Sequence, residues 1–368
     1  MATQEIPNLK SLLASRRGGP SRGRGRGRSG PGASHEDKEA MRDNAIRNTD
    51  QDAAGSRVSC VELGYLHDPY ARLFASQPST RRLPLLNRGT YVRTSAIDHL
   101  VDKFLTTYPD SPKQIVSLGA GTDTRFFRLQ DGYPESRIVY HEVDFAVNTV
   151  AKLASIRKHP QLHTKLGAIE PPRTPNEASY YSPTYNVHAL DLRSLASSSD
   201  GVPIPELPNL DPSIPTLLLS EMCLTYLQPS TVSSILHIFL TRYIAVPTPA
   251  ALVLYEPVLP NDAFGRTMIS NLSTRNISLP TLNAYPELSD QRARLKGYGF
   301  VDGYKVADTA LIWREWVPKA EKDRVAGLEM LDELEELELL LRHYCVAWAW
   351  RDGGAEGVFS KAWADVQE

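Results

Sequence analysis

The stretch Val116-Ser-Leu-Gly-Ala-Gly-Thr-Asp-Thr124 decides the fold, because a hydrophobic strand runs directly into a glycine turn. The residues after it, about 125–129, are expected to begin a helix. Glycines in such a turn let the backbone approach a ligand where a Cβ atom would collide. The G-x-G-x-x-G pattern of a dinucleotide site is incomplete, since Gly119 and Gly121 are followed by Thr-Asp-Thr. The turn therefore favours an adenosine ligand without phosphates, although many glycine turns simply end a strand.

Short apolar runs recur on both sides of this turn, with helical stretches between them. This alternation predicts a mostly parallel sheet covered by helices, with ligands bound at the carboxyl ends of the strands. Leucines at three- and four-residue spacing predict an amphipathic helix over residues 328–350, and residues 167–182 and 197–215 are interpreted as excursions outside the core layers. The predicted strands are residues 114–118, 137–143, 185–190, 215–220 and 251–255.

Acidic residues follow three further predicted strands, at the point where each strand ends. Glu142 and Asp144 lie about 20 residues beyond the glycine turn, where a nucleotide-binding fold presents a carboxylate to ribose hydroxyls. Asp191 is placed to accept a hydrogen bond from an adenine amino group, and Glu221 follows an apolar strand and so needs a polar partner. Together these features fit S-adenosylmethionine. Asp144, Asp191 and Glu221 each have an alternative role as the cap of the helix that follows.

Composition excludes several classes of function. Lysine plus arginine (41) nearly equals aspartate plus glutamate (43), so the chain lacks the basic excess that drives nucleic-acid binding. The three cysteines, Cys60, Cys223 and Cys345, are far apart and lack C-x-x-C spacing, which argues against a disulfide framework or a metal site. No apolar run approaches the roughly 20 residues that span a bilayer. We therefore expect a soluble protein of the reducing cytosol or nucleus.

The chain is expected to form one large domain between two less structured ends. Residues 1–48 form a predicted disordered extension that includes the run Arg22-Gly-Arg-Gly-Arg-Gly-Arg28, because such a composition buries too little surface to offset ordering entropy. An RNA-binding tail is the alternative interpretation of this run. Residues 49–352 form the predicted domain, and residues 353–368 a C-terminal tail.

Eight blocks within residues 49–350 match one known family and make the assignment more specific than the glycine turn alone. They are Gly64-Tyr-Leu-His-Asp-Pro-Tyr70, Arg88-Gly-Thr-Tyr-Val-Arg93, Leu118-Gly-Ala-Gly-Thr-Asp-Thr124, Glu142-Val-Asp-Phe145, Ser220-Glu221, Tyr255-Glu-Pro257, Asp262-Ala-Phe-Gly265 and Arg342-His-Tyr-Cys345. Through these blocks the chain resembles the leucine carboxyl methyltransferase family.

The resemblance implies a class I S-adenosylmethionine-dependent methyltransferase fold, which is a Rossmann-like α/β sheet of seven strands with an antiparallel last strand and helical lid and substrate insertions. It implies an enzyme that methylates the C-terminal leucine carboxylate of the protein phosphatase 2A catalytic subunit. Such an enzyme is expected to be a cytoplasmic monomer, with the nucleus as a second location. The positions that the resemblance assigns to S-adenosylmethionine are Arg57, Arg93, Gly119, Asp144, Asp191, Leu192 and Glu221.

Two residues are expected to act on the substrate. The guanidinium fork of Arg93 is suited to the carboxylates of cofactor and substrate, and Tyr226 corresponds to a family tyrosine beside the substrate carboxylate. Arg57 departs from the family pattern, which usually has lysine there. The alternatives are a surface salt bridge for Arg93 and a packing role for Tyr226.

Other functions remain open at this stage. A related family of enzymes methylates a carboxylate on a hypermodified guanosine of tRNA, but it resembles the same domain joined to a long β-propeller. A small-molecule carboxyl methyltransferase is a second alternative, because fold alone does not fix the substrate. A third is an inactive adaptor that binds S-adenosylmethionine and uses its Arg-Gly run on RNA.

Overall fold

The computed structural model describes residues 35–76, 80–166, 177–196, 203–354 and 357–368. Residues Met41–Glu368 form one compact unit. The described residues before it, 35–40, begin the helix α2 (His35–Glu62). Within the described residues, every helix is too short or too polar to cross a bilayer.

An eight-stranded sheet forms the centre of the unit, in the order β3-β4-β2-β1-β5-β6-β8-β7. Strands β4, β2, β1, β5 and β6 run parallel, whereas β8 runs antiparallel between β6 and β7. The predicted class I sheet with an antiparallel last strand is confirmed, and β3 adds an antiparallel edge to its seven strands. The strands are β1 (Lys113–Leu118), β2 (Ile138–Asp144), β3 (Tyr180–Tyr181), β4 (Tyr185–Ala189), β5 (Thr216–Glu221), β6 (Ala250–Pro257), β7 (Gly303–Asp308) and β8 (Tyr344–Arg351).

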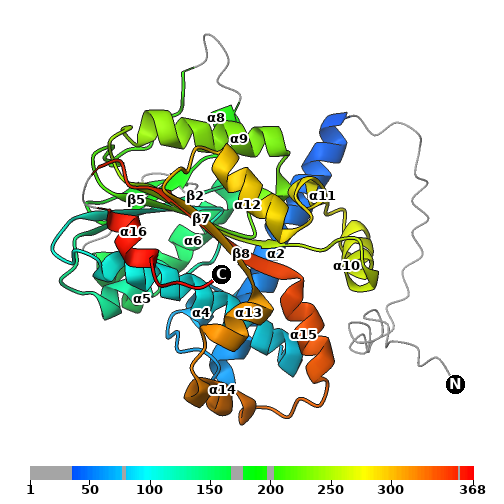
Figure 1. Cartoon of the computed structure of the whole chain (residues 1–368). Helices are drawn as coiled ribbons and strands as arrows, with labels where there is room; N and C mark the ends of the chain where they lie inside the picture. The colour runs from blue at the N-terminus through cyan, green and yellow to red at the C-terminus, as the bar shows by residue number, and fades with distance from the viewer. Residues whose placement is uncertain (1–34, 77–79, 167–176, 197–202, 355–356) are drawn as a thin grey trace, which may run out of the picture. The chain divides into compact units, whose positions relative to one another are not determined.

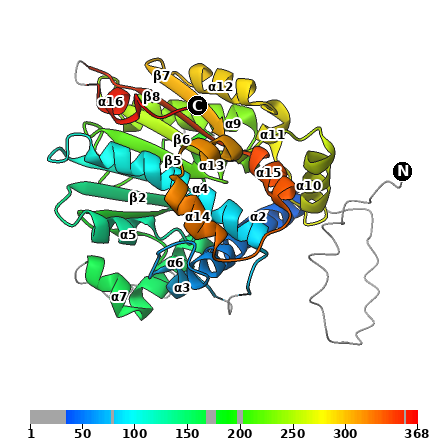
Figure 2. The ribbon, with the colours of Figure 1, turned by 60° about the horizontal axis from the view of Figure 1, so that its bottom comes forward.

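Helices cover both faces of this sheet. Two views show α4, α13, α14 and α15 on one side of the sheet and α9 and α12 on the other (Figures 1 and 2). The longer helices are α4 (Pro84–Thr106), α5 (Arg125–Gly132), α6 (Ala146–Lys158), α9 (Pro229–Ile238), α10 (Ala263–Ser273), α12 (Leu288–Gly297), α14 (Lys319–Ala326) and α15 (Leu334–Arg342). The short ones are α3 (Ala71–Phe74), α7 (Pro160–His163), η1 (Thr164–Leu166), α8 (Arg193–Ala196), η2 (Leu224–Tyr226), η3 (Phe239–Tyr243), α11 (Pro280–Ala284), α13 (Thr309–Glu315) and α16 (Val358–Trp363).

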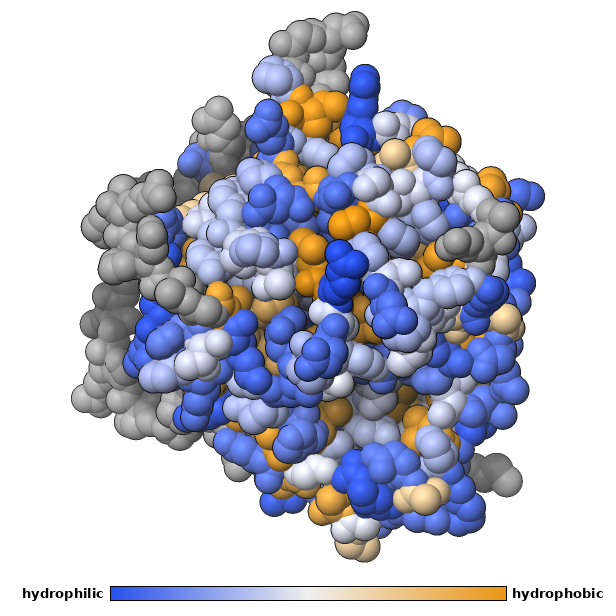
Figure 3. Space-filling view, turned by 90° about the vertical axis from the view of Figure 1, so that its left-hand side faces the viewer, coloured by the Kyte–Doolittle hydropathy of each residue, from blue (hydrophilic) through white to orange (hydrophobic). Residues whose placement is uncertain are grey.

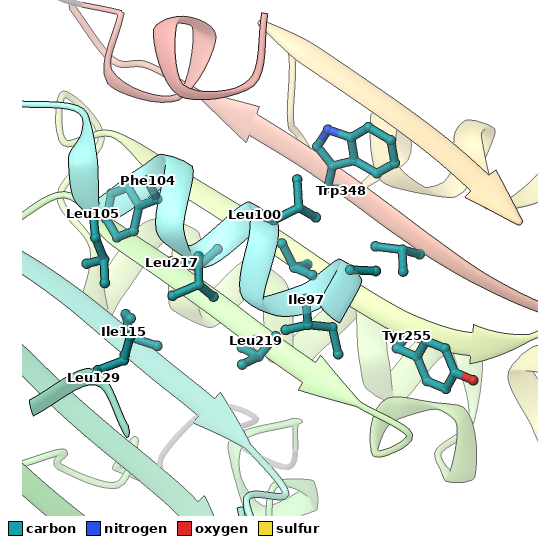
Figure 4. Packing of buried hydrophobic residues seen from close by; sticks show 14 of the residues in the cluster. Ile97, Leu100, Phe104, Leu105, Ile115, Leu129, Leu217, Leu219, Tyr255 and Trp348 are labelled. Carbon is teal, nitrogen blue, oxygen red and sulfur yellow. The ribbon is translucent and has the colours of Figure 1, made fainter. Parts of the chain in front are cut away.

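Alternation along the strands divides the core into two layers. In β5, Leu217 and Leu219 face one buried cluster, while Leu218 between them faces the other. Figure 4 shows α4 lying across the first layer, with its Leu100 and Phe104 above the leucines of β5. Because both faces are buried, β5 and β6 consist of nearly continuous apolar runs, whereas β1, β2 and β4 also carry buried polar side chains such as Gln114, His141 and Asn186.

The surface of one side is mainly hydrophilic. On the face shown in Figure 3, hydrophobic residues occur only in small groups among hydrophilic ones. Single exposed apolar side chains such as Val147 and Val246 are ordinary on a protein surface.

The predicted helix over residues 328–350 is wrong in its second half. Helix α15 ends at Arg342, and β8 follows as a central strand buried on both faces. A short apolar run of this kind cannot be distinguished from a buried helix by periodicity alone.

The predicted ends of the domain also differ from the structure. Residues 35–48, assigned to the extension, belong to α2, and residues 1–34 with the Arg-Gly run lie outside the described residues. The predicted tail contains α16, where Phe359 and Trp363 are fully buried. Trp363 packs edge-on against Trp350 of β8 at 5.6 Å, and this apolar contact holds the segment on the sheet.

Candidate active site

A cavity of about 410 Å³ lies at the carboxyl ends of β1, β2 and β5. Ligand pockets typically have volumes of about 300 to 1,000 Å³. The predicted residues that line it are Arg57, Arg93, Gly119, Asp144, Glu221 and Tyr226. The fold thus brings together residues that are up to 169 positions apart, from Arg57 to Tyr226.

The glycine turn forms the floor of the cavity. Gly119 and Gly121 have φ angles of 67° and 44°, in the left-handed region that favours glycine. A Cβ atom at Gly119 would overlap the Cys223 sulfur, and one at Gly121 would overlap the Asp50 carboxylate. Glycine is thus needed at both positions for the chain's own packing, and the close approach of a ligand to this turn stays a prediction.

Asp144 connects the glycine turn to the end of β2. Its carboxylate accepts hydrogen bonds from Gly121 N at 2.7 Å, Phe145 N at 2.7 Å and Asn148 Nδ2 at 2.9 Å. Burial raises the pKa of Asp144, and these three donors partly oppose the shift. The capping alternative does not hold, because the N-cap of α6 is Phe145, and Asp144 lines the cavity.

Helix α2 forms a wall of the cavity that the sequence analysis did not foresee. Asp50 accepts hydrogen bonds from the backbone nitrogen and the hydroxyl of Thr122, at 2.7 and 2.8 Å. Arg42 donates to the carbonyl of Tyr226 at 3.0 Å. These bonds attach the helix to the floor and to the far side of the cavity.

Arg93 is held from two directions. Its Nε donates to Glu221 Oε1 at 2.5 Å, and its guanidinium lies over the Tyr255 ring, 4.9 Å from the centroid. Tyr344, which also lines the cavity, stacks on Tyr255 at 5.5 Å. The two terminal nitrogens of Arg93 have no hydrogen-bond partner among the described residues. They are therefore available to a ligand carboxylate.

Glu221 is bound by arginines and does not cap the next helix. Its second oxygen lies 3.4 Å from Arg125 Nη2. Burial alone would raise the pKa of Glu221, but the charges of Arg93 and Arg125 outweigh it and lower the pKa. Glu221 therefore stays ionised.

Arg57 and Tyr226 lie on different walls. Arg57 forms an ion pair with Asp68 at 3.5 Å, and its side chain keeps the charge that the resemblance expects there.

Tyr226 packs with Ile277, Leu279 and Leu282, so the packing alternative holds as well. Burial raises the pKa of Tyr226, which therefore keeps its proton and can donate a hydrogen bond.

Asp191 and Leu192 do not line this cavity. The Asp191 carboxylate accepts hydrogen bonds from Arg193 N at 2.9 Å and Arg193 Nη2 at 2.6 Å, which fits its capping alternative at the start of α8. Leu192 is buried in the second core layer. Their assignment to the cofactor stays a prediction.

The wall residues fit a cofactor with an adenosine and an amino-acid end. The glycine turn gives backbone access, Asp144 places carboxylate oxygens beside it, and the unpartnered Arg93 nitrogens suit a carboxylate. When bound there, S-adenosylmethionine would supply an activated methyl group on a sulfonium.

Comparison with known proteins agrees with this arrangement. A family model described as leucine carboxyl methyltransferase matches residues 45–239. Leucine carboxyl methyltransferase 1 of Aspergillus fumigatus is 47% identical and covers 97% of this chain and 96% of its own. The Emericella nidulans protein of the same name is 46% identical over 100% of this chain and 98% of its own, and an Arabidopsis thaliana homolog is 36% identical over 86% and 91%. The chain therefore belongs to the leucine carboxyl methyltransferase family and is an S-adenosylmethionine-dependent methyltransferase.

Proposed function

We propose that the chain methylates the α-carboxylate of the C-terminal leucine of the protein phosphatase 2A catalytic subunit and forms a methyl ester. The observation that carries the proposal is that one cavity holds Arg93, whose unpartnered terminal nitrogens suit the carboxylate of the cofactor, and Tyr226, whose hydroxyl can donate to a substrate carboxylate. The names of the relatives, which refer to a leucine carboxyl group, support the same substrate class.

The chemistry needs no general base. A chain-terminal carboxylate has a pKa of about 3.3 to 3.7 and is already ionised at neutral pH. The protein therefore has to hold one carboxylate oxygen in line with the methyl group and keep its charge available. Tyr226, which keeps its proton, can orient the carboxylate through one hydrogen bond without neutralising it.

Exclusion of water is the second requirement, because water stabilises the separated charges of the reactants. Helix α2 contributes one wall toward this, since Asp50 bonds to Thr122 of the glycine turn and Arg42 to the carbonyl of Tyr226. The proposed partner is the phosphatase tail. The proposed location is the cytoplasm, with the nucleus as a second site.

A tritiated-methyl transfer assay tests the proposal. The full chain is incubated with S-adenosylmethionine and either the intact phosphatase catalytic subunit or a version that lacks its last leucine. We expect label on the intact protein only, released by mild base as an ester is. Label on both proteins, or on neither of them, would contradict the proposal.

A further inference from the structure

Arg125 is a buried charge that the proposed chemistry does not use. Its side chain is 1% exposed, although it directly follows the glycine turn as the first residue of α5. Nε donates to Asp98 at 3.0 Å, Nη1 to Asp123 at 2.5 Å, and Nη2 to Glu221 at 3.4 Å. Each of the three guanidinium nitrogens is thus bound to a carboxylate.

These carboxylates belong to three different elements, each of which contributes residues to the cavity wall. Asp98 lies on α4, the helix that carries Arg93, while Asp123 belongs to the glycine turn and Glu221 ends β5. Asp123 and Glu221 line the cavity themselves. Arg125 therefore connects the helix, the turn and the strand from behind the wall.

We propose that Arg125 is a positioning residue for the amino-acid end of the cofactor. It holds Glu221 on one oxygen, and Glu221 holds the Nε of Arg93 with the other. This arrangement leaves the terminal nitrogens of Arg93 for the ligand carboxylate. The inference rests on the proposed function, because it takes that carboxylate to belong to S-adenosylmethionine.

The charge balance explains why a guanidinium is needed at this position. Without Arg125, Asp98 would keep Arg128 at 2.5 Å and Glu221 would keep Arg93 at 2.5 Å. Asp123 would lose its only ion-pair partner among the described side chains. Asp123 would keep the hydrogen bond from the backbone nitrogen of residue 125, at 3.0 Å. A partly buried carboxylate without a counter-charge is costly, so it would draw a cavity arginine toward itself.

Lysine cannot replace this arrangement. An ammonium keeps the charge but is a single point on a flexible stem, whereas the planar guanidinium presents donors in several fixed directions. In Arg125→Lys at least one of the three carboxylates must therefore lose its bond. The variant tests positioning without removal of the charge.

The experiment compares two ligands by calorimetry on the full chain. S-adenosylhomocysteine carries the amino-acid end, whereas methylthioadenosine has the adenosine and the sulfur without it. We expect Arg125→Lys to weaken S-adenosylhomocysteine binding about tenfold or more, as for a lost charge-assisted hydrogen bond. Binding of methylthioadenosine should stay as in the wild type.

Arg128→Lys is the matched control. Arg128 lies one turn further along α5 and pairs with Asp98 and Asp68, neither of which lines the cavity. The Arg128→Lys variant should therefore be less stable in thermal unfolding, while the ratio of its affinities for S-adenosylhomocysteine and methylthioadenosine stays as in the wild type. Should Arg125→Lys unfold, the double variant Arg125→Met/Asp98→Asn removes both charges of the 3.0 Å pair without a change in the cavity lining and is expected to show the same selective loss.

Two results would overturn the positioning role. One is an equal decrease in the affinity for both ligands in Arg125→Lys, which would indicate a purely structural residue. The other is an Arg125→Lys variant that binds S-adenosylhomocysteine with wild-type affinity. A wild-type chain that binds neither ligand would overturn the proposed function instead.

Discussion

Two neighbouring side chains fix the orientation of the Arg93 guanidinium, one at its edge and one at its face. Glu221 fixes the Nε end of the guanidinium plane, and the Tyr255 ring supports its face. A cation over an aromatic face and an ion pair in a partly buried site both act more strongly than on the surface. The residue is thus prepared for a planar, two-point contact with a carboxylate.

Arg93→Lys tests this two-point contact. We expect kcat/KM for methyl transfer to fall by about tenfold to a hundredfold, because lysine keeps the charge but cannot form a paired bond. Arg88→Lys is the control, since Arg88 is buried on the same helix and donates to the Glu329 carbonyl away from the cavity. A kcat/KM of Arg93→Lys close to that of Arg88→Lys would show that the two-point contact of the Arg93 guanidinium is not needed for methyl transfer.

Some site residues were predictable from the sequence and others were not. Asp144 and Glu221 follow apolar strands, and strand ends are where this fold collects its ligands. Asp50 was not predictable, because its bonds to Thr122 depend on how α2 folds across 72 residues. Arg125 could have been predicted, because a charged residue between the glycine turn and the apolar pair Phe126-Phe127 is expected to be buried and to need partners of opposite charge.

At the scale of elements, α16 packs against β8 and becomes part of the core. Trp350 and Trp363 pack edge-on, and Trp363 Nε1 donates to the Leu100 carbonyl of α4 at 3.0 Å. The segment that composition favoured as a tail is therefore part of the core. Its signal was the pair of aromatic residues at four-residue spacing, Phe359 and Trp363, which an exposed tail would not be expected to carry.

Trp363→Ala measures this contribution. We expect the free energy of unfolding in urea to fall by about 3 to 5 kcal/mol, since a large buried side chain is replaced by a cavity. Gln367→Ala, at an exposed position of the same segment, should change it little. A loss of stability no larger for Trp363→Ala than for the control would show that α16 does not belong to the core.

The strands themselves divide by how clearly the sequence marks them. The runs of β1, β2, β4, β5 and β6 were predicted within two residues, because each is apolar and bounded by polar or glycine residues. Strand β7 was missed because its Gly303-Tyr-Lys-Val-Ala-Asp308 lies at the edge and is only partly buried. Strand β8 was mistaken for helix because it is buried on both faces.

At the scale of the whole molecule, two buried histidines link stability to pH. His141 of β2 and His188 of β4 are almost fully buried, and their Nδ1 and Nε2 atoms lie 3.0 Å apart. Burial lowers the pKa of His141 to about 3 and that of His188 to about 4. The folded chain therefore keeps both rings neutral under conditions where the unfolded chain takes up protons.

The free energy of unfolding should fall as the pH drops from about 6.5 toward 4. Each histidine is expected to contribute a decrease of about 1.4 kcal/mol per pH unit in this range. The double variant His141→Leu/His188→Leu should show a shallower slope in urea unfolding between these pH values. The exposed His67→Gln is the control. Equal slopes for the wild type and the double variant would contradict the linkage.

The position of β8 has a consequence for biosynthesis. The strand enters between β6 and β7, both of which precede it in the chain. Until Tyr344–Arg351 has been synthesised, β6 can pair only with β5 and one of its edges lacks a partner, while β7 has no strand beside it. Closure of the sheet is thus a late event in the life of each new molecule.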